Sequence, residues 1–223
     1  MTFADADPSD VAGAILTPFD QAYRHAKDTA AWAMTHVQGR SLQPTISNRL
    51  AGAAYGLALE HQRSMTVLVE AKAYGSALTL LRPVVEGFAL GYWLLYQASE
   101  AQIIAFAEGK STLTLDVLLR RIADEHTAGP EKGQLQKLVK WLNSMTHGGV
   151  EHLVMRQSKS TVGPQYTIED MASALSIGAW VAKMAALDIV GGVVGDVERA
   201  TQMLSEVDGF RPVHAYLGLS PTA

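Results

Sequence analysis

Residues 77–96, ALTLLRPVVEGFALGYWLLY, form the most apolar run of the chain. Apolar side chains recur on every side of a helix drawn through this run, and Arg82 and Glu86 are its only charged residues. A helix without a polar face usually lies at the centre of a fold. The run therefore predicts a central helix over 76–98, with Ser76 as its N-terminal cap.

Helix start and stop signals divide the rest of the chain. Thr17, Ser99 and Thr167 each precede a first turn that contains an acidic or amide residue, the pattern of a capped helix. The other expected helices cover 17–38, 47–72, 99–109, 114–127, 130–146, 167–190 and 193–206. No segment shows the alternation of a strand. The sequence predicts an all-α bundle of about seven or eight helices.

The length and organisation of the chain predict one domain. No linker or repeat divides the chain, and its 223 residues suit a single large domain. We expect the helical domain to cover 17–208, between an N-terminal tail at 1–16 and a C-terminal tail at 209–223. Gly191-Gly192 is expected to end the helix that starts after Thr167.

Composition excludes several kinds of site. The chain has no cysteine, so disulfides and thiolate metal sites are absent. It contains none of the Glu-x-x-His, His-Glu-x-x-His, Gly-x-Ser-x-Gly or phosphate-loop patterns. The net charge is -4 and basic residues are scattered, so any RNA contact must be local. We expect no bound metal and no cofactor.

Two apolar stretches raise the question of a membrane. Residues 76–98 and 171–195 each contain two charges, Arg82 with Glu86 and Lys183 with Asp188. Charges in mid-span are costly in a bilayer. The N-terminal sequence also lacks the basic and apolar regions of a signal peptide. We therefore expect buried helices of a cytoplasmic protein that has no membrane contact.

Arg82 and Glu86 are four residues apart, so they share one face of the central helix. A buried charge needs a partner. The two side chains are expected to pair with each other, and a neighbouring helix can add a third group. Such a pair is either an internal brace or part of a site. The brace is favoured, because purely structural ion pairs perturb ionisation as active sites do.

A second polar cluster follows in KWLNSMTHGG, residues 140–149. Asn143 and His147 lie four apart at the end of the expected helix. His147 can act as a general acid or base, or it can cap the last carbonyl groups. His152 and Arg156 follow closely and are further candidate binding residues.

The segments ALTLLRPVVEGFALGYWLLY and WLNSMTHGG together resemble bacterial helical proteins related to the HEPN superfamily. The resemblance covers about 47–190. It implies a HEPN-like helical bundle that forms a homodimer. Many HEPN proteins are metal-independent ribonucleases of toxin–antitoxin and phage-defence systems, and others bind nucleotides or proteins.

The HEPN nuclease motif has an arginine, then a polar residue, then a histidine after three more residues. Asn143 and His147 match the polar residue and the histidine, but Leu142 stands at the arginine position. Arg82 or Arg156 could replace that arginine in space. A looser match, Arg121 to His126, is of the kind expected by chance in a chain of this length.

Two functions follow from these patterns. The first is a non-catalytic module that binds RNA, a nucleotide or a protein partner in a stress or defence system, and Leu142 favours it. The second is a metal-independent endoribonuclease that uses His147 and Asn143. In either case Arg82, Glu86, Arg156 and His152 are candidate binding residues.

Overall fold

The apolar run forms helix α3 (Tyr74–Tyr92), which continues into the π-helical turn η2 (Trp93–Gln97). The computed structural model describes residues 16–126, 131–146, 149, 153–156 and 165–207. Helix α3 contacts α2 along its length, and helices α5, α6 and α8 contact its other faces. The prediction of a central helix is confirmed.

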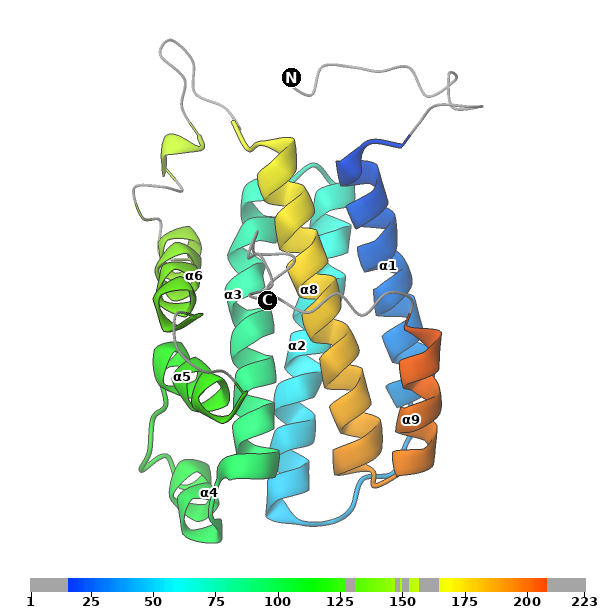
Figure 1. The fold of residues 1–223 in the computed structure, drawn as a ribbon, viewed down its shortest axis with the longest axis vertical. Coiled ribbons are helices and arrows are strands. Elements are labelled where there is room, and N and C mark those ends of the chain that lie inside the picture. Colours follow the sequence, from blue (N-terminus) through cyan, green and yellow to red (C-terminus); the bar gives the residue numbers. More distant parts are fainter. Residues whose placement is uncertain (1–15, 127–130, 147–148, 150–152, 157–164, 208–223) are drawn as a thin grey trace.

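Four long helices form the body of the fold (Figure 1). They are α1 (Pro18–Val37), α2 (Ile46–Glu70), α3 and α8 (Ile168–Asp188), and α8 continues into a second π-helical turn, η3 (Ile189–Val193). Helices α1, α2 and α3 alternate in direction. Helix α8 runs in the same direction as α3 and packs against all three.

A chain that leaves one helix and continues in a parallel neighbour needs a long crossover. Helices α4 (Glu100–Ala107), α5 (Leu115–His126) and α6 (Glu131–Thr146) supply it, and they ascend one side of α3 (Figure 1). Helix α9 (Val197–Glu206) then turns back beside α1. The described residues thus form eight α-helices and no strand, which confirms the all-α bundle.

Local capping explains most helix starts. Thr17 and Ser99 form capping boxes with Asp20 and Gln102, and the Thr167 side chain accepts from the Asp170 N–H. These side chains satisfy N–H groups that have no partner inside the helix. The three predicted N-terminal caps are confirmed.

Two predicted boundaries are wrong. Helix α3 starts at Tyr74 rather than at a Ser76 cap, because Lys72 adopts a φ of 57° and reverses the chain two residues earlier. Gly191-Gly192 does not end the last long helix, since the chain stays helical through η3. A Cβ at Gly192 would lie 2.5 Å from Leu95 Cδ2, so this glycine permits close packing. The expected tails, 1–16 and 209–223, lie almost wholly outside the described residues.

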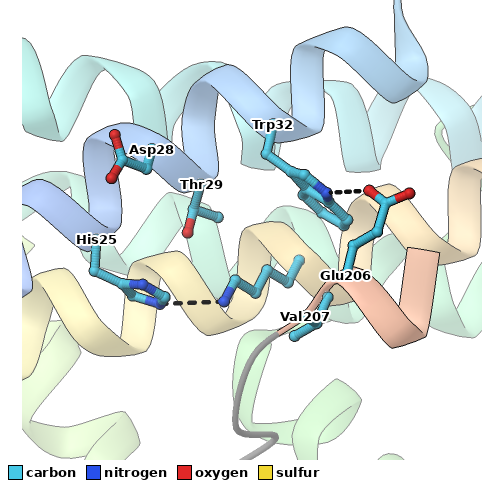
Figure 2. Close-up of a pocket in the computed structure, with 7 residues that line it drawn as sticks. His25, Asp28, Thr29, Trp32, Glu206 and Val207 are labelled. Carbon is cyan, nitrogen blue, oxygen red and sulfur yellow. Dashed lines mark hydrogen bonds between the residues drawn. The ribbon is translucent and has the colours of Figure 1, made fainter.

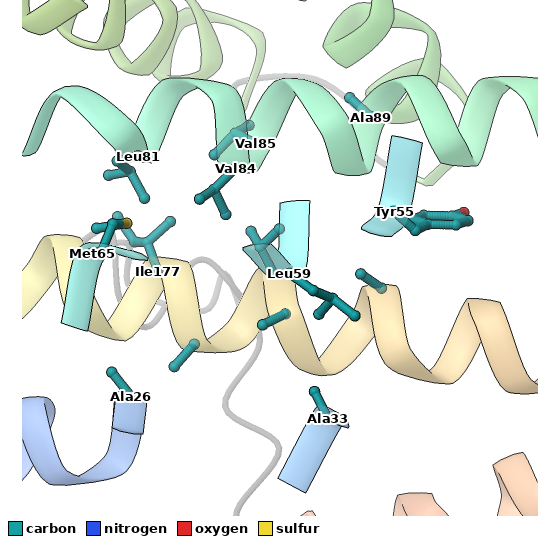
Figure 3. Close-up of a cluster of buried hydrophobic side chains, with 14 of the residues drawn as sticks. Ala26, Ala33, Tyr55, Leu59, Met65, Leu81, Val84, Val85, Ala89 and Ile177 are labelled. Carbon is teal, nitrogen blue, oxygen red and sulfur yellow. The ribbon is translucent and has the colours of Figure 1, made fainter. Parts of the chain in front are cut away.

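The core lies where α3 and α8 meet α2 and α1 (Figure 3). Large side chains such as Leu81, Met65 and Leu59 fill the centre. Helix α8 contributes mainly small residues: Ala174, Ala179, Ala182, Ala185 and Ala186 are all completely buried. Small residues let helix axes approach closely, so α8 fits between its neighbours.

Helices α2 and α3 meet where there is no room for a side chain. A Cβ on Gly87 of α3 would lie 2.8 Å from the Ala54 carbonyl oxygen and 3.2 Å from the Ala58 nitrogen, both on α2. A Cβ on Gly91 would lie 2.7 Å from the Tyr55 ring. Glycine at these two positions therefore sets the distance between the two helices.

By length and composition, Tyr74–Gln97 and Ile168–Val193 could cross a membrane. Of the most apolar window in each, 44% and 56% of the residues are buried inside the bundle. Core helices of a soluble protein pass the same test, so the absence of membrane contact stays a prediction.

Gly87→Ala should destabilise the protein by about 1–3 kcal/mol, because the added methyl group meets backbone atoms of α2. Gly56→Ala is the matched control. A Cβ at Gly56 meets nothing within 4 Å, so alanine should stabilise α2 by about 0.5–1 kcal/mol. Urea unfolding of both variants tests this, and equal effects would contradict the close approach at Gly87.

Candidate functional site

Arg82 connects the two polar clusters that the sequence singles out. Its Nη1 donates to Oδ1 of Asn143 on α6, and its Nε lies 3.5 Å from Oε2 of Glu86. The expected pairing of Arg82 with Glu86 is confirmed, and Asn143 is the third group from a neighbouring helix. The guanidinium is thus held between α3 and α6.

The Arg82–Glu86 pair is not fully buried. The Arg82 side chain is 19% exposed and the Glu86 side chain 38% exposed. The expectation of a buried pair is therefore corrected, since α6 covers this face of α3 only in part. Water can reach the carboxylate, which lowers the cost of losing its partner.

Further contacts near this group hold helix α6 on α3. The Thr79 hydroxyl lies 2.9 Å from the Gly75 carbonyl oxygen and 3.3 Å from the Met145 carbonyl oxygen across the interface. Leu142 is completely buried in the hydrophobic core. Leu142, which stands where the HEPN resemblance would require arginine, therefore serves packing.

The remaining predicted residues are placed differently. Arg156 is exposed, and its Nη1 donates at 3.4 Å to the hydroxyl of Tyr166, which precedes the N-terminal cap of α8. The contacts of the described residues do not bring Arg156 to Arg82. His147 and His152 lie outside the described residues, so their predicted roles stay predictions.

The end of α6 agrees with the sequence. The helix ends at Thr146, and the Gly149 N–H donates to the Ser144 carbonyl oxygen at 2.8 Å. A bond of this span closes many helix C-termini. A Cβ at Gly149 would lie 2.3 Å from Ser144 Oγ, so glycine is required by the close return of the chain.

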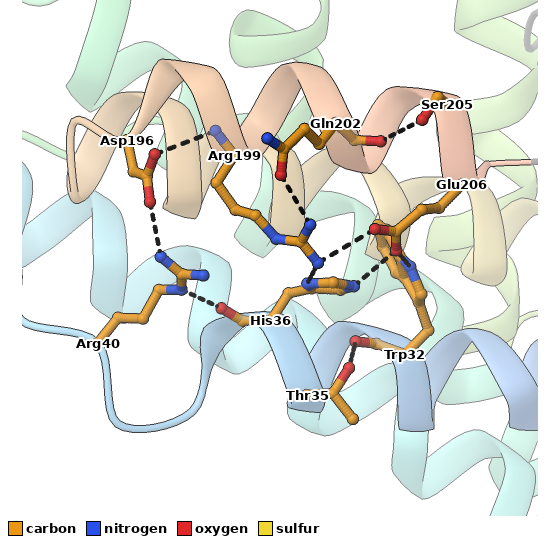
Figure 4. Close-up of polar contacts among 9 residues, drawn as sticks. All are labelled: Trp32, Thr35, His36, Arg40, Asp196, Arg199, Gln202, Ser205 and Glu206. Carbon is orange, nitrogen blue, oxygen red and sulfur yellow. Dashed lines mark hydrogen bonds and ion pairs between the residues drawn. The ribbon is translucent and has the colours of Figure 1, made fainter.

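A network that the sequence did not reveal joins α1 to α9 (Figure 4). Oε2 of Glu206 accepts from Trp32 Nε1 and from His36 Nε2, each at 3.0 Å. Arg199 Nη2 lies 3.1 Å from both Glu206 Oε1 and His36 Nδ1. The hydrogen bond from Trp32 contributes most to lowering the pKa of Glu206.

Beside this network is a small hollow of about 190 Å³ between α1, α8 and α9 (Figure 2). Its polar wall includes His25 and Asp28 of α1 and Lys183 of α8. Lys183 Nζ lies 3.2 Å from His25 Nε2. Burial, and then the nearby ammonium of Lys183, lower the pKa of His25, so its neutral ring accepts this hydrogen bond.

A second unforeseen cluster surrounds Asp188 in the last turn of α8. The Tyr55 hydroxyl donates to Asp188 Oδ2 at 2.7 Å, and the Tyr96 hydroxyl donates to Oδ1 at 3.0 Å. Burial raises the pKa of Asp188, and the two hydrogen bonds offset part of this rise. The signal available in the sequence was an acid inside an apolar helix, which requires hydrogen-bond donors.

The family comparison covers most of this structure. A model described as a family of unknown function, DUF6988, matches residues 55–213. The chain belongs to the DUF6988 family. No curated protein and no solved structure matches the chain.

The region that matches DUF6988 contains every residue of the Arg82 group and of the Asp188 cluster. It includes Arg82, Glu86 and Asn143, and it also includes Tyr55 and Asp188. The α1–α9 network differs, because its partners on α1 precede the matched region. The Arg82 group and the Asp188 cluster are therefore the sites built from DUF6988 residues alone.

The Arg82–Asn143 hydrogen bond can be measured by a double-mutant cycle of Arg82→Ala and Asn143→Ala. A hydrogen bond to a charged group predicts a coupling energy of about 1–2 kcal/mol. Arg82→Ala alone should cost about 1–3 kcal/mol, less than the 3–5 kcal/mol of a fully buried pair. The control cycle combines Arg24→Ala with Asn143→Ala, because Arg24 is an exposed arginine on α1. Equal coupling energies in the two cycles would contradict the Arg82–Asn143 contact.

The Asp188 cluster predicts a pH dependence. An acid whose pKa is raised by folding penalises the folded state increasingly as pH rises from its unfolded value towards its folded value. Wild type should therefore lose stability relative to Asp188→Asn as pH rises from about 4. Unfolding free energies across a pH series test this, with exposed Asp28→Asn as the control. A difference that shrinks as pH rises would contradict the burial of this carboxyl.

Proposed function

We propose that the chain is a HEPN-like module that binds phosphate groups of RNA or a nucleotide at the Arg82–Asn143 site. The observation that carries the proposal is the hydrogen bond between the Arg82 guanidinium and the Asn143 amide. It joins the conspicuous charge of α3 to the polar residue of the HEPN motif on α6. Arginine suits phosphate because its planar donors match the phosphate oxygens.

The geometry supports binding in preference to cleavage. Glu86 lies beside the guanidinium and offsets part of its positive charge. Leu142 is committed to the core, so the motif has no arginine of its own on α6. A partly neutralised arginine holds an anion less strongly, which suits reversible recognition better than stabilisation of a charged transition state.

One observation favours endoribonuclease activity as the second candidate. Arg82 reaches Asn143 from α3, so an arginine stands beside the motif although position 142 is leucine. His147 follows Asn143 by four residues and would supply the general acid or base. This reaction would need no metal ion.

The wider setting rests on the HEPN resemblance. We expect a cytoplasmic homodimer that acts in a bacterial stress or defence system, with RNA, a nucleotide or a protein as partner. A dimer could place two Arg82 sites along one RNA and so compensate for the net charge of -4.

Binding of a fluorescently labelled single-stranded RNA and of a labelled nucleotide tests the proposal by anisotropy. Arg82→Gln should weaken binding about 10- to 100-fold, since it removes a charge-assisted contact. Arg24→Gln removes the same charge from an exposed position on α1 and should change the affinity little at the same salt concentration. An equal loss of affinity in both variants would mean that only the net charge matters, and it would refute a site at Arg82.

The same RNAs, incubated with a chelator, separate binding from cleavage. Cleavage by wild type that disappears in His147→Ala would support the endoribonuclease. Intact RNA together with Arg82-dependent binding would support the non-catalytic module.

A further inference from the structure

Asp188 is held at the junction of three elements. Its two carboxylate oxygens accept hydrogen bonds from Tyr55 of α2 and from Tyr96 of η2, while Asp188 itself ends α8. Tyr55 is completely buried, and Figure 3 shows its ring at one edge of the core with the hydroxyl directed away from the aliphatic side chains. Tyr96 is 51% exposed, so the cluster extends from the core to the surface.

The negative charge at this junction has no positive counterpart among the described residues. None of their ion pairs includes Asp188, and its hydrogen-bond donors are neutral phenols. A cation would relieve the cost of this unpaired charge.

The surroundings are aromatic. The ring centroids of Tyr92 and Tyr96 lie 4.9 Å apart, with the planes inclined by 53°, and Phe88 continues the row along the same helix. Aromatic faces attract organic cations. A Cβ at Gly192 would lie 2.9 Å from the Tyr96 hydroxyl, so the glycine leaves space for Tyr96 to reach Asp188.

We propose that Asp188, Tyr55 and Tyr96 form a binding site for a guanidinium group. The group is carried either by a small molecule or by an arginine side chain of a protein partner. This site is separate from the proposed phosphate site, which lies between α3 and α6.

The hydrogen-bond count selects this chemistry. A carboxylate accepts about four hydrogen bonds, and the two tyrosines use one on each oxygen. One further position on each oxygen matches the paired N–H groups of a guanidinium. The half-exposed Tyr96 ring supplies the aromatic surface on which the planar cation can stack. A Ca²⁺ ion would instead require six or more oxygen ligands.

Titration with methylguanidinium chloride tests the proposal, with sodium chloride added to hold ionic strength constant. Wild type should show saturable binding by saturation-transfer NMR. At about ten times the Kd, Tm should rise by about 3–6 °C. Asp188→Asn should lose at least about tenfold in affinity, whereas Asp28→Asn, an exposed acid on α1, should bind as wild type does.

A second readout separates a ligand site from a structural brace. Without ligand, Asp188→Asn should have a higher Tm than wild type at neutral pH, since the amide keeps an acceptor and removes the unpaired charge. A lower Tm for Asp188→Asn, or no saturable binding by wild type, would overturn the proposal. Equal binding of tetramethylammonium, which has no N–H donors, would also overturn the guanidinium assignment.

The source of the group is tested with arginine blocked at both its amino and carboxyl ends. Tighter binding of blocked arginine than of methylguanidinium would support a partner's side chain. Equal or weaker binding would support a small molecule.

Discussion

The close contact of α2 with α3 determines how the rest of the bundle is arranged. Because Gly87 and Gly91 bring the two helices together without intervening side chains, α3 has no polar face on that side. Its remaining surface contacts α8 and, from the crossover, helices α5 and α6. The Arg82–Asn143 group lies where α3 meets α6. The Asp188 cluster lies where Tyr96, just after α3, meets the end of α8.

The charged side chains Arg82 of α3 and Asp188 of α8 differ in the partners that stabilise them. Arg82 has a neighbouring carboxylate and an amide from the next helix, so its charge is both paired and hydrogen-bonded. Asp188 has hydrogen bonds but no opposite charge among the described residues. Hydrogen bonds satisfy the lone pairs of a buried carboxylate without neutralising it, so the negative charge of Asp188 stays unbalanced, whereas Glu86 balances part of the charge of Arg82.

The sequence predicted the helices well because their signals are local. Thr17, Ser99 and Thr167 each form an N-terminal cap with a residue three positions later, so a short stretch of sequence predicts the helix start. The apolar run predicts α3 from its composition alone. The Arg82–Glu86 pairing was equally accessible, since it is one helical turn long. The wrong boundary at Ser76 depends on the reversal of the backbone at Lys72, and the one at Gly191-Gly192 on packing against other parts of the chain. The partners of Asp188, and the two partners of Glu206 on α1, lie more than ninety residues away in sequence, beyond any local pattern.

The α1–α9 network also has a consequence for the order of folding during synthesis. Trp32 and His36 emerge from the ribosome early, but their partners Arg199 and Glu206 follow more than 160 residues later. A domain generally folds as a unit. The face of α1 that carries Trp32 and His36 therefore stays uncovered by α9 until the last helix of the described bundle has left the ribosome. The Glu206 carboxylate can join that face only then.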